Sequence, residues 1–342
     1  MKKSRFFSKI IFLINSLLAI VTLLAYILPF IPPSWFPKLA VLSFILPVLI
    51  VLHIAFVIFW LLQWRRQFLL STFILIIGIG SIHCMYRFGG DPASTTQPDD
   101  LKILTYNVKS FNHKKWINED GLDQKIIQFI TSSGADIVCL QEYRSDYQLS
   151  KGQYPYQYQK LTNTKYKFGH TIYSKYPIVN SGSFDFEQSG NNILYVDVKV
   201  DQDTVRVYNA HLQSFGVSTD FEDIQEHSDR FMRRIGNAVV KQESQVQQFI
   251  DHEAQSPYPV IVAGDFNNSA FSYTYRKMKG NKQDAFIQAG SGIGKTFDFN
   301  FMPLRIDFIM PDDQFQVNSF MNYTVKYSDH YPVMTSLKLL EK

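Results

Sequence analysis

The first 90 residues of this chain contain no aspartate or glutamate. All 30 acidic residues lie in residues 91–342 with 26 of the 34 basic ones, which gives this second segment a formal charge of −4. The net charge of +4 therefore comes from the first segment and is no evidence for a basic nucleic-acid surface on the second. The eight basic residues of the first segment are Lys2, Lys3, Arg5, Lys9, Lys38, Arg65, Arg66 and Arg87.

Cysteine is also scarce, since the chain contains only Cys84 and Cys139. Cys84 ends an apolar run, whereas Cys139 lies inside a predicted strand at 136–140. Two thiols in such different settings do not form a disulfide framework. We expect Cys139 to be a small, buried apolar side chain.

Three long apolar runs fill the first segment, at residues 10–31, 39–62 and 68–85. A membrane-spanning helix needs about 20 apolar residues, and about 17 still suffice. Three such runs without an acidic residue are not typical of a soluble core. A cleaved signal peptide is not favoured either, because the first run is too long and two more follow. We therefore predict an all-α transmembrane region at residues 1–88.

The basic residues predict the orientation of these spans. Cytoplasmic loops are enriched in lysine and arginine, which places MKKSRFFSK and QWRRQ in the cytoplasm. The protein is then a multi-pass protein of the cell (inner) membrane, and its second segment is extracytoplasmic. Trp35 and Trp64 suit the two interfaces. His53 is the titratable side chain near the middle of the second run, where we expect it to pack against another span.

The sequence GGDPASTTQPDD at residues 89–100 predicts a linker, because glycine, proline and serine interrupt it. Short apolar runs then alternate with polar loops through residues 101–342, which we predict to be one domain. Helices are expected at 122–132 and 231–252. Strands are expected at 102–106, 136–141, 170–174, 194–200, 204–210, 260–263, 306–310 and 333–337. Many strands with few helices predict a layered α/β or α+β domain.

Polar residues occur at the ends of these strands. The residues are Asn107, Glu142, His211, Asp265, Asn267, Asp307, Asp329 and His330. Taken singly, each fits a turn, a cap, a solvated loop charge or a structural histidine. Asp307 differs, because an unpaired carboxylate in an apolar strand is costly to bury; its natural partner is His330. Together they suit a hard cation with oxygen ligands, a carboxylate that activates water, and a histidine that stabilises charge.

The stretches that carry these residues resemble the endonuclease/exonuclease/phosphatase family, which includes deoxyribonucleases, neutral sphingomyelinases and inositol polyphosphate 5-phosphatases. They are TYNV, LQEY, FGHTIYSKYPI, NAHLQS, VAGDFNNS, RIDFIM and SDHYPV, in the family's order. The resemblance spans about residues 101–337. It implies a four-layer sandwich in which two mixed β-sheets face each other, with helices outside and the active site on one rim.

The resemblance also implies roles for single residues. Glu142, Asn107 and Asp329 correspond to the metal side of the site, where Mg²⁺ or Mn²⁺ is expected. Asp265 corresponds to the carboxylate that activates water, and Asn267 and His211 to groups that contact phosphate. Asp307 corresponds to the carboxylate that holds the imidazole of His330.

One position departs from the abasic-site endonucleases of this family, which have an acidic residue two positions after the asparagine. Here that residue is Lys109, which either contacts substrate phosphate or faces solvent. We therefore expect a phosphoesterase that acts on lipid-headgroup or small phosphoester substrates at a bilayer. An extracytoplasmic nuclease remains the alternative, since basic residues cluster at 230–234 and 276–282. A non-catalytic binding module is a third hypothesis. The presence of Glu142, Asp265 and His330 argues against it, since such a module would be expected to have lost one of them. The sequence names no protein partner.

Overall fold

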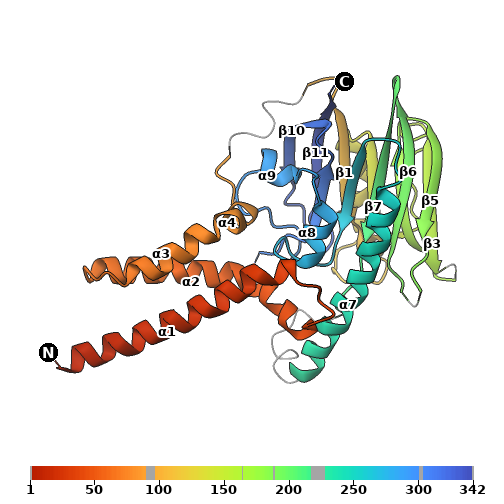
Figure 1. Ribbon diagram of the computed structural model, residues 1–342. Coiled ribbons are helices and arrows are strands. Elements are labelled where there is room, and N and C mark those ends of the chain that lie inside the picture. Colours follow the sequence, from red (N-terminus) through yellow and green to blue (C-terminus); the bar gives the residue numbers. More distant parts are fainter. Residues whose placement is uncertain are drawn as a thin grey trace.

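The computed structural model describes residues 2–89, 97–163, 165–187, 189–216, 228–299 and 303–340. Helices of the first segment extend side by side away from a domain rich in strands (Figure 1). The linker predicted at 89–100 falls largely on residues 90–96, which lie outside the described residues. Its boundaries therefore stay a prediction.

Two helices of the first segment are long and apolar enough to cross a membrane. The first is α1 (Lys2–Ile27), continued by η1 (Leu28–Phe30), and the second is α2 (Leu42–Leu62), preceded by η2 (Pro37–Val41). The third predicted span is a broken pair, α3 (Phe68–Ile77) and α4 (Ile79–Met85), bent by 70°. The three-span prediction is thus supported in part: two helices have the length and composition of a membrane span, and a third span depends on counting the bent pair as one.

Gly78 lies at the bend between α3 and α4, where the backbone comes close to α1. A Cβ atom at this position would lie 1.9 Å from the hydroxyl oxygen of Tyr26. Glycine is therefore required for this approach, and its lack of a side chain weakens the helix at the same point. The apolar run at 68–85 did not reveal this break, because hydropathy does not distinguish a straight helix from a bent one.

A buried polar cluster joins α1, α2 and α3. The two ring nitrogens of His53 lie 3.1 Å from Thr22 Oγ1 and 2.9 Å from Ser71 Oγ. Ser71 in turn donates to Asn15 Oδ1 at 2.8 Å. Polar side chains in such a setting hydrogen-bond between helices, and His53 therefore packs against other helices as expected.

The second segment forms two mixed sheets. The six-stranded sheet has the order β10-β11-β1-β2-β4-β3 and the five-stranded sheet the order β5-β6-β7-β8-β9. Only β1/β2 and β7/β8 pair in parallel. The strands are β1 (Leu101–Asn107), β2 (Ile137–Arg144), β3 (Tyr156–Asn163), β4 (Phe168–Ser174), β5 (Ile178–Phe184), β6 (Asn192–Val200), β7 (Asp203–His211), β8 (Val260–Asp265), β9 (Asp307–Pro311), β10 (Phe315–Asn322) and β11 (Val333–Leu339).

Helices flank the two sheets. Ile126 and Ile130 of α5 (Leu122–Ser132) pack on the outer face of the six-stranded sheet, and Val246 and Phe249 of α7 (Ser228–Glu253) pack on that of the five-stranded sheet. The short helices α8 (Tyr273–Lys279) and α9 (Ala285–Ala289) complete the domain. The predicted architecture of two mixed sheets flanked by helices is confirmed.

The three strands that the sequence did not predict are β3, β5 and β10. Each lies at an edge of its sheet. An edge strand is shielded on fewer sides, so it carries more polar residues and lacks a continuous apolar run. In β3, for example, YQYQKLTN contains only exposed and half-buried residues.

A buried amide bridge joins the facing sheets next to their apolar core. Asn209 of β7 donates to the carbonyl oxygens of Leu140 and Thr171 at 3.0 and 2.9 Å. Its side-chain oxygen accepts from Gln141 Nε2 at 2.7 Å. The same Gln141 nitrogen donates to Thr105 Oγ1 at 2.9 Å, so the bridge connects β7 to β1, β2 and β4. Hydrogen bonds are directional, and these therefore set the position of one sheet relative to the other.

We expect Asn209→Leu, a substitution of similar size, to lower the free energy of unfolding by roughly 2–4 kcal/mol, because it leaves buried polar groups without a partner. Thermal unfolding of the full-length protein would measure this. Asn281→Leu at an exposed position is the matched control, for which a change within about 0.5 kcal/mol is expected. Equal unfolding temperatures for both variants would show that the bridge does not stabilise the fold.

Candidate active site

All eight predicted site residues lie at the same end of the two sheets. Asn107, His211 and Asp265 are the last residues of β1, β7 and β8, whereas Asp307 is the first residue of the antiparallel β9. His330 lies just before β11. Parallel strands bring their carboxyl ends to one edge, and an antiparallel neighbour begins there. The facing sheets thus bring side chains that are up to 223 positions apart into one cluster.

The Asp265 carboxylate occupies the centre of this cluster and is fully buried. Its oxygens accept from Asn107 Nδ2 at 3.0 Å and from the backbone N–H of Asn267 at 2.7 Å. The Nε2 atoms of His211 and His330 lie 3.6 and 3.7 Å from Asp265 Oδ2. Burial raises the pKa of Asp265, and the positive charge of His330 opposes this rise. The carboxylate is therefore surrounded by hydrogen-bond donors while it remains basic.

Asp307 and His330 form the pair that the sequence predicted. His330 Nδ1 lies 3.0 and 3.2 Å from the two Asp307 oxygens, and both residues are buried. Burial alone would lower the pKa of His330, but the charges of Asp307 and Asp265 raise it above its ordinary value. At neutral pH the imidazole is thus a cation with its Nε2 side directed toward Asp265.

His211 differs from His330 in its charge. Burial, followed by its neighbours His170 and His330, lowers the pKa of His211 well below the ordinary value. The ring of His170 lies 5.0 Å from that of His211, edge to face, and its own pKa falls to about 4 through burial. His211 is therefore neutral beside a cationic His330. His170 lies in the stretch FGHTIYS, but no strand end marked it as a site residue.

Glu142 lies in β2 rather than after it, in a left-handed backbone conformation with φ of +50°. The register with β4 shifts between Leu140 and Tyr143, which identifies a β-bulge at this residue. The bulge turns its carboxylate toward Asn107, whose Nδ2 atom is 3.4 Å from Glu142 Oε1. Left-handed conformation costs free energy for a glutamate and is typical of functional sites.

Lys109 is half-buried at the edge of the cluster and pairs with Asp329, whereas its contact with substrate phosphate stays a prediction. Its Nζ atom lies 2.5 Å from Asp329 Oδ2, and its φ of +40° begins a run of left-handed residues through Asn112. Burial alone would raise the pKa of Asp329, but the charges of His330 and Lys109 hold it below its ordinary value. Lys109 therefore partly neutralises the Asp329 carboxylate. In the abasic-site enzymes, the position of Lys109 corresponds to an acidic residue.

The donor set around Glu142 suits a hard cation. Burial raises the pKa of Glu142 and the charge of Asp329 raises it further, so a cation would relieve both effects. The oxygens of Glu142, Asn107 and Asp329 are ligands that Mg²⁺ prefers. A second group, Asp265, Asp307 and His330, has ligand atoms within 4.8 Å of one another. Its imidazole is protonated and hydrogen-bonded to Asp307, so we favour the Glu142 side.

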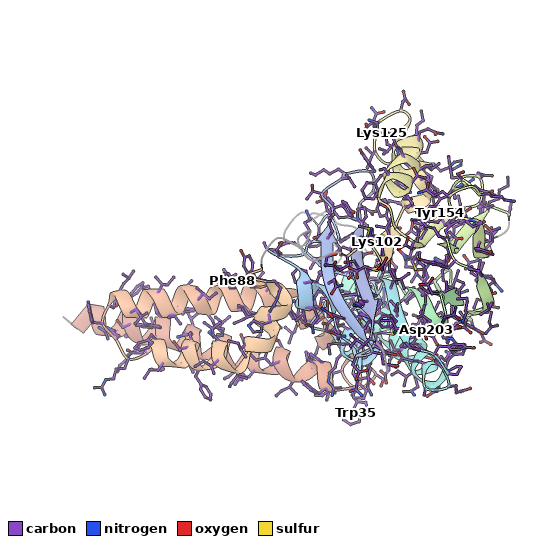
Figure 2. All side chains as sticks on the ribbon, turned by 90° about the horizontal axis from the view of Figure 1, so that it is seen from above. Trp35, Phe88, Lys102, Lys125, Tyr154 and Asp203 are labelled. Atoms are coloured by element: carbon purple, nitrogen blue, oxygen red, sulfur yellow. The ribbon has the colours of Figure 1, made fainter. Side chains whose placement is uncertain are left out.

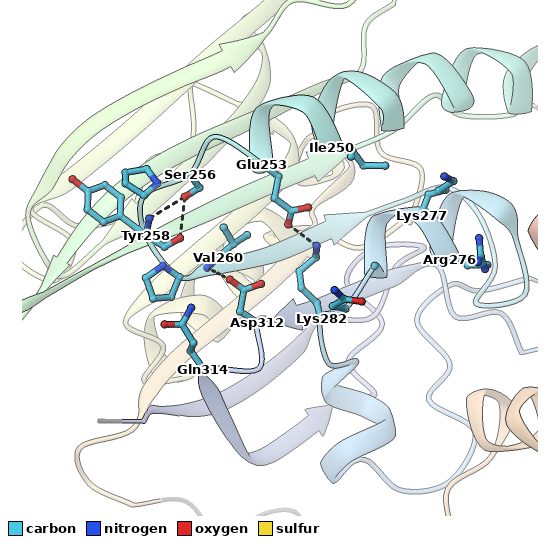
Figure 3. A pocket seen from close by; sticks show the side chains of 14 residues that line it. Ile250, Glu253, Ser256, Tyr258, Val260, Arg276, Lys277, Lys282, Asp312 and Gln314 are labelled. Carbon is cyan, nitrogen blue, oxygen red and sulfur yellow. Dashed lines mark hydrogen bonds and ion pairs between the residues drawn. The ribbon is translucent and has the colours of Figure 1, made fainter. Parts of the chain in front are cut away.

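A wide depression of about 710 Å³ lies away from this cluster (Figure 3). It surrounds Val260 at the first residue of β8, the opposite end of the strand from Asp265. One of its three basic residues, Lys282, pairs with Glu253 at 2.5 Å. A smaller polar cleft of about 370 Å³ does border the cluster, with Lys109, Ser328 and Asp329 in its wall. This cleft therefore meets the cluster at Asp329.

Solved structures with the same fold include three proteins whose names indicate their activity or identity. They are the mannosyl-6-phosphatase Bt3783 of Bacteroides thetaiotaomicron (19% identity, TM-score 0.53), humanized TDP2 of D. rerio (16%, 0.55) and the human Nocturnin catalytic domain with bound sulfate (15%, 0.54). The matches cover 70, 70 and 71% of this chain and 100, 99 and 96% of those chains. A comparison with curated protein sequences found no match.

Two family models match the sequence. Residues 8–85 match a domain of unknown function. Residues 104–330, about two thirds of the chain, match the endonuclease/exonuclease/phosphatase family. The chain therefore belongs to the endonuclease/exonuclease/phosphatase family, whose members hydrolyse phosphoester bonds.

Proposed function

We propose that this protein is a membrane-anchored, metal-dependent hydrolase that uses activated water on small or lipid-linked phosphoesters. One observation carries the proposal: the buried Asp265 carboxylate lies between a neutral histidine, His211, and a cationic one, His330. Asn107 connects it to the carboxylate oxygens of Glu142. A base, a cationic imidazole and a cation site within one cluster are the parts that phosphoester hydrolysis requires.

Each residue of the cluster then has a role. Asp265 accepts a proton from water as the water oxygen bonds to phosphorus and the bond from phosphorus to the leaving oxygen breaks. The His330 cation, held by Asp307, stabilises the developing negative charge, and it is the acid nearest to a leaving oxygen that needs a proton. Neutral His211 and the Asn267 amide donate to the phosphate oxygens. Mg²⁺ or Mn²⁺ on Glu142, Asn107 and Asp329 supplies shielding of the phosphate charge.

The structural relatives support a phosphoester substrate without specifying it. One is named a mannosyl-6-phosphatase, and another holds a sulfate anion, whose shape resembles that of phosphate. Nucleic acid is less well supported, because residues 91–342 carry a formal charge of −4 and several of the clustered basic residues have other contacts. Arg276 lies over the ring of Phe30 at 4.3 Å, and Arg234 donates to the carbonyl oxygen of Gly216 at 2.8 Å.

We further propose a multi-pass protein of the cell membrane with its catalytic domain on the extracytoplasmic side. Lys38 and Trp35 lie at the end of α2 next to the domain, whereas Arg65 and Arg66 follow its other end. A helix of 21 residues is about 31 Å long, which matches the apolar thickness of a bilayer. The paired arginines then mark the cytoplasmic side.

The metal prediction concerns both activity and stability. We expect hydrolysis of bis-p-nitrophenyl phosphate to require Mg²⁺ or Mn²⁺, and Mg²⁺ to raise the unfolding temperature. Glu142→Gln should lose both effects, because it removes a charged oxygen ligand. Glu187→Gln, at an exposed glutamate, is the control that should retain them. Full activity of the wild type in excess EDTA would contradict this prediction.

The catalytic prediction concerns the base and the cation. Asp265→Asn should lower kcat by on the order of 10²-fold or more and leave the fold intact, since the two side chains have nearly the same shape. His330→Ala should have a similar effect. Steady-state kinetics at saturating Mg²⁺ would measure both variants against Asp203→Asn, an exposed residue at the far end of β7. Near-wild-type kcat in either variant would refute the role of that residue.

The orientation prediction is tested by fusion of alkaline phosphatase to the C-terminus. The reporter should be active, because it folds on the extracytoplasmic side, while a fluorescent protein that folds only in the cytoplasm should stay dark. Exchanging Arg65 and Arg66 for serine should weaken this pattern. A bright fluorescent fusion with an inactive phosphatase would reverse the proposed orientation.

A further inference from the structure

An apolar cavity of about 140 Å³ lies between the membrane region and the catalytic cluster. Its wall is made by segments that are far apart in the sequence. They are represented by Val41, Phe44, Phe215, Phe231, Phe297 and Ile306. Its lining is mainly apolar, and its volume is close to the roughly 150 Å³ of an engineered apolar cavity that binds benzene, so it can accept an apolar group of that size.

On one side the cavity borders the candidate catalytic residues. Asn267, whose backbone N–H binds the Asp265 carboxylate, is part of its wall. The ring of Phe297 lies 4.9 Å from the ring of His330, and the two residues form a β-bridge. Ile306 immediately precedes Asp307. A group bound in the cavity is therefore in reach of a phosphate at His330 and Asn267.

On the other side the cavity is bounded by the membrane helices. Val41 ends η2, and Phe44 lies in the first turn of α2. The ring of Phe44 packs edge to face on Phe215 at 5.2 Å. Hydrogen bonds hold this junction in place: Ser269 donates to the Ser43 carbonyl oxygen at 3.0 Å, and Ser34 donates to the Glu243 carboxylate at 2.8 and 3.1 Å. The cavity thus lies at the level where α2 enters the bilayer.

The polar cleft borders the cluster at Asp329, the residue next to His330, and its lining residues differ from those of the apolar cavity. Besides Lys109 and Asp329, its lining includes Trp116, Asp298 and Lys326. Trp116 is 57% exposed, and the Lys109 ammonium lies 5.1 Å from the centre of its ring. The cluster therefore borders two different surfaces. Charged and aromatic groups lie on its Asp329 side, and apolar groups lie on its Asn267 side.

We propose that the substrate is a bilayer lipid phosphoester, with the first methylene groups of its apolar chain in the cavity and its headgroup in the polar cleft. This inference rests on the proposed hydrolase function and specifies its substrate. The phosphate then lies at His330 and Asn267. The cavity holds only the segment of chain next to the phosphate, and the rest of the chain continues along α2 into the membrane.

The test uses the full-length protein in nanodiscs and a series of alkyl p-nitrophenyl phosphates, from methyl to octyl, below their micelle concentrations. In these esters the nitrophenyl group represents the headgroup and the alkyl group represents the chain. We expect kcat/KM to rise by roughly three- to fourfold for each added methylene until the cavity is filled. A flat series would overturn the chain site while the hydrolase function stands. No hydrolysis of any ester with Mg²⁺ would instead reject the function itself.

Two substitutions place a polar amide in the cavity wall, Phe215→Asn and Phe231→Asn. In each variant, the kcat/KM for the octyl ester divided by that for the methyl ester should fall by tenfold or more. Because both values come from the same preparation, a lower fraction of folded protein does not change this ratio. Phe88→Ser is the matched control, since Phe88 is 90% exposed and lies at the junction away from Trp35 (Figure 2). An unchanged ratio in both cavity variants would refute the assignment.

A vesicle experiment separates a bilayer lipid from a soluble amphiphile. Phosphatidylcholine vesicles that contain a diacylglycerol p-nitrophenyl phosphodiester are mixed with nanodiscs, or this phosphodiester is placed in the nanodiscs themselves. We expect faster release of nitrophenol when lipid and protein share one bilayer. Equal rates in both arrangements, or hydrolysis of the soluble esters alone, would overturn the bilayer as the source.

Discussion

The active site depends on the relative position of two β-sheets, and a buried amide bridge sets this position. Asn107 and Glu142 belong to one sheet, whereas His211 and Asp265 belong to the other. A sliding movement of one sheet by a single residue would separate Asn107 Nδ2 from Asp265, which are now 3.0 Å apart. Apolar packing alone tolerates such movement, but the directional bonds of Asn209 to the other sheet do not.

Charge balance is the second constraint, because the cluster buries several carboxylates at once. Asp265 and Asp307 share the cation of His330, and Asp329 is paired with Lys109. Glu142 has only the long contact with Asn107, and it is therefore the carboxylate with the most to gain from a divalent cation. The same arrangement explains why His211 and His330, both within 4 Å of Asp265, differ in charge: only His330 has Asp307 behind it.

The apolar N-terminal helices pack against the catalytic domain. Contacts of Ser34, Ser43 and Phe44 with the domain hold α2 against its catalytic end rather than on a flexible tether. Arg305 adds a bond to the Cys84 carbonyl oxygen at the end of α4. These contacts fix the position of the catalytic end of the domain relative to α2. In the proposed membrane orientation, this arrangement favours substrates that are held at the membrane surface.

The sequence by itself determined the apolar helices, the central strands and the set of candidate site residues that the structure brings together. These features depend on local hydropathy and on motifs such as GDFN and SDH, which are read without knowledge of distant contacts. The edge strands were missed because their polar composition resembles that of loops. The tertiary structure alone decided the bend at Gly78, the ion pair of Lys109, the charge of each histidine and the cavity beside Phe44. Each of these depends on atoms more than 20 positions apart in the chain. The order of residues alone does not give the burial of such atoms or the distance between them.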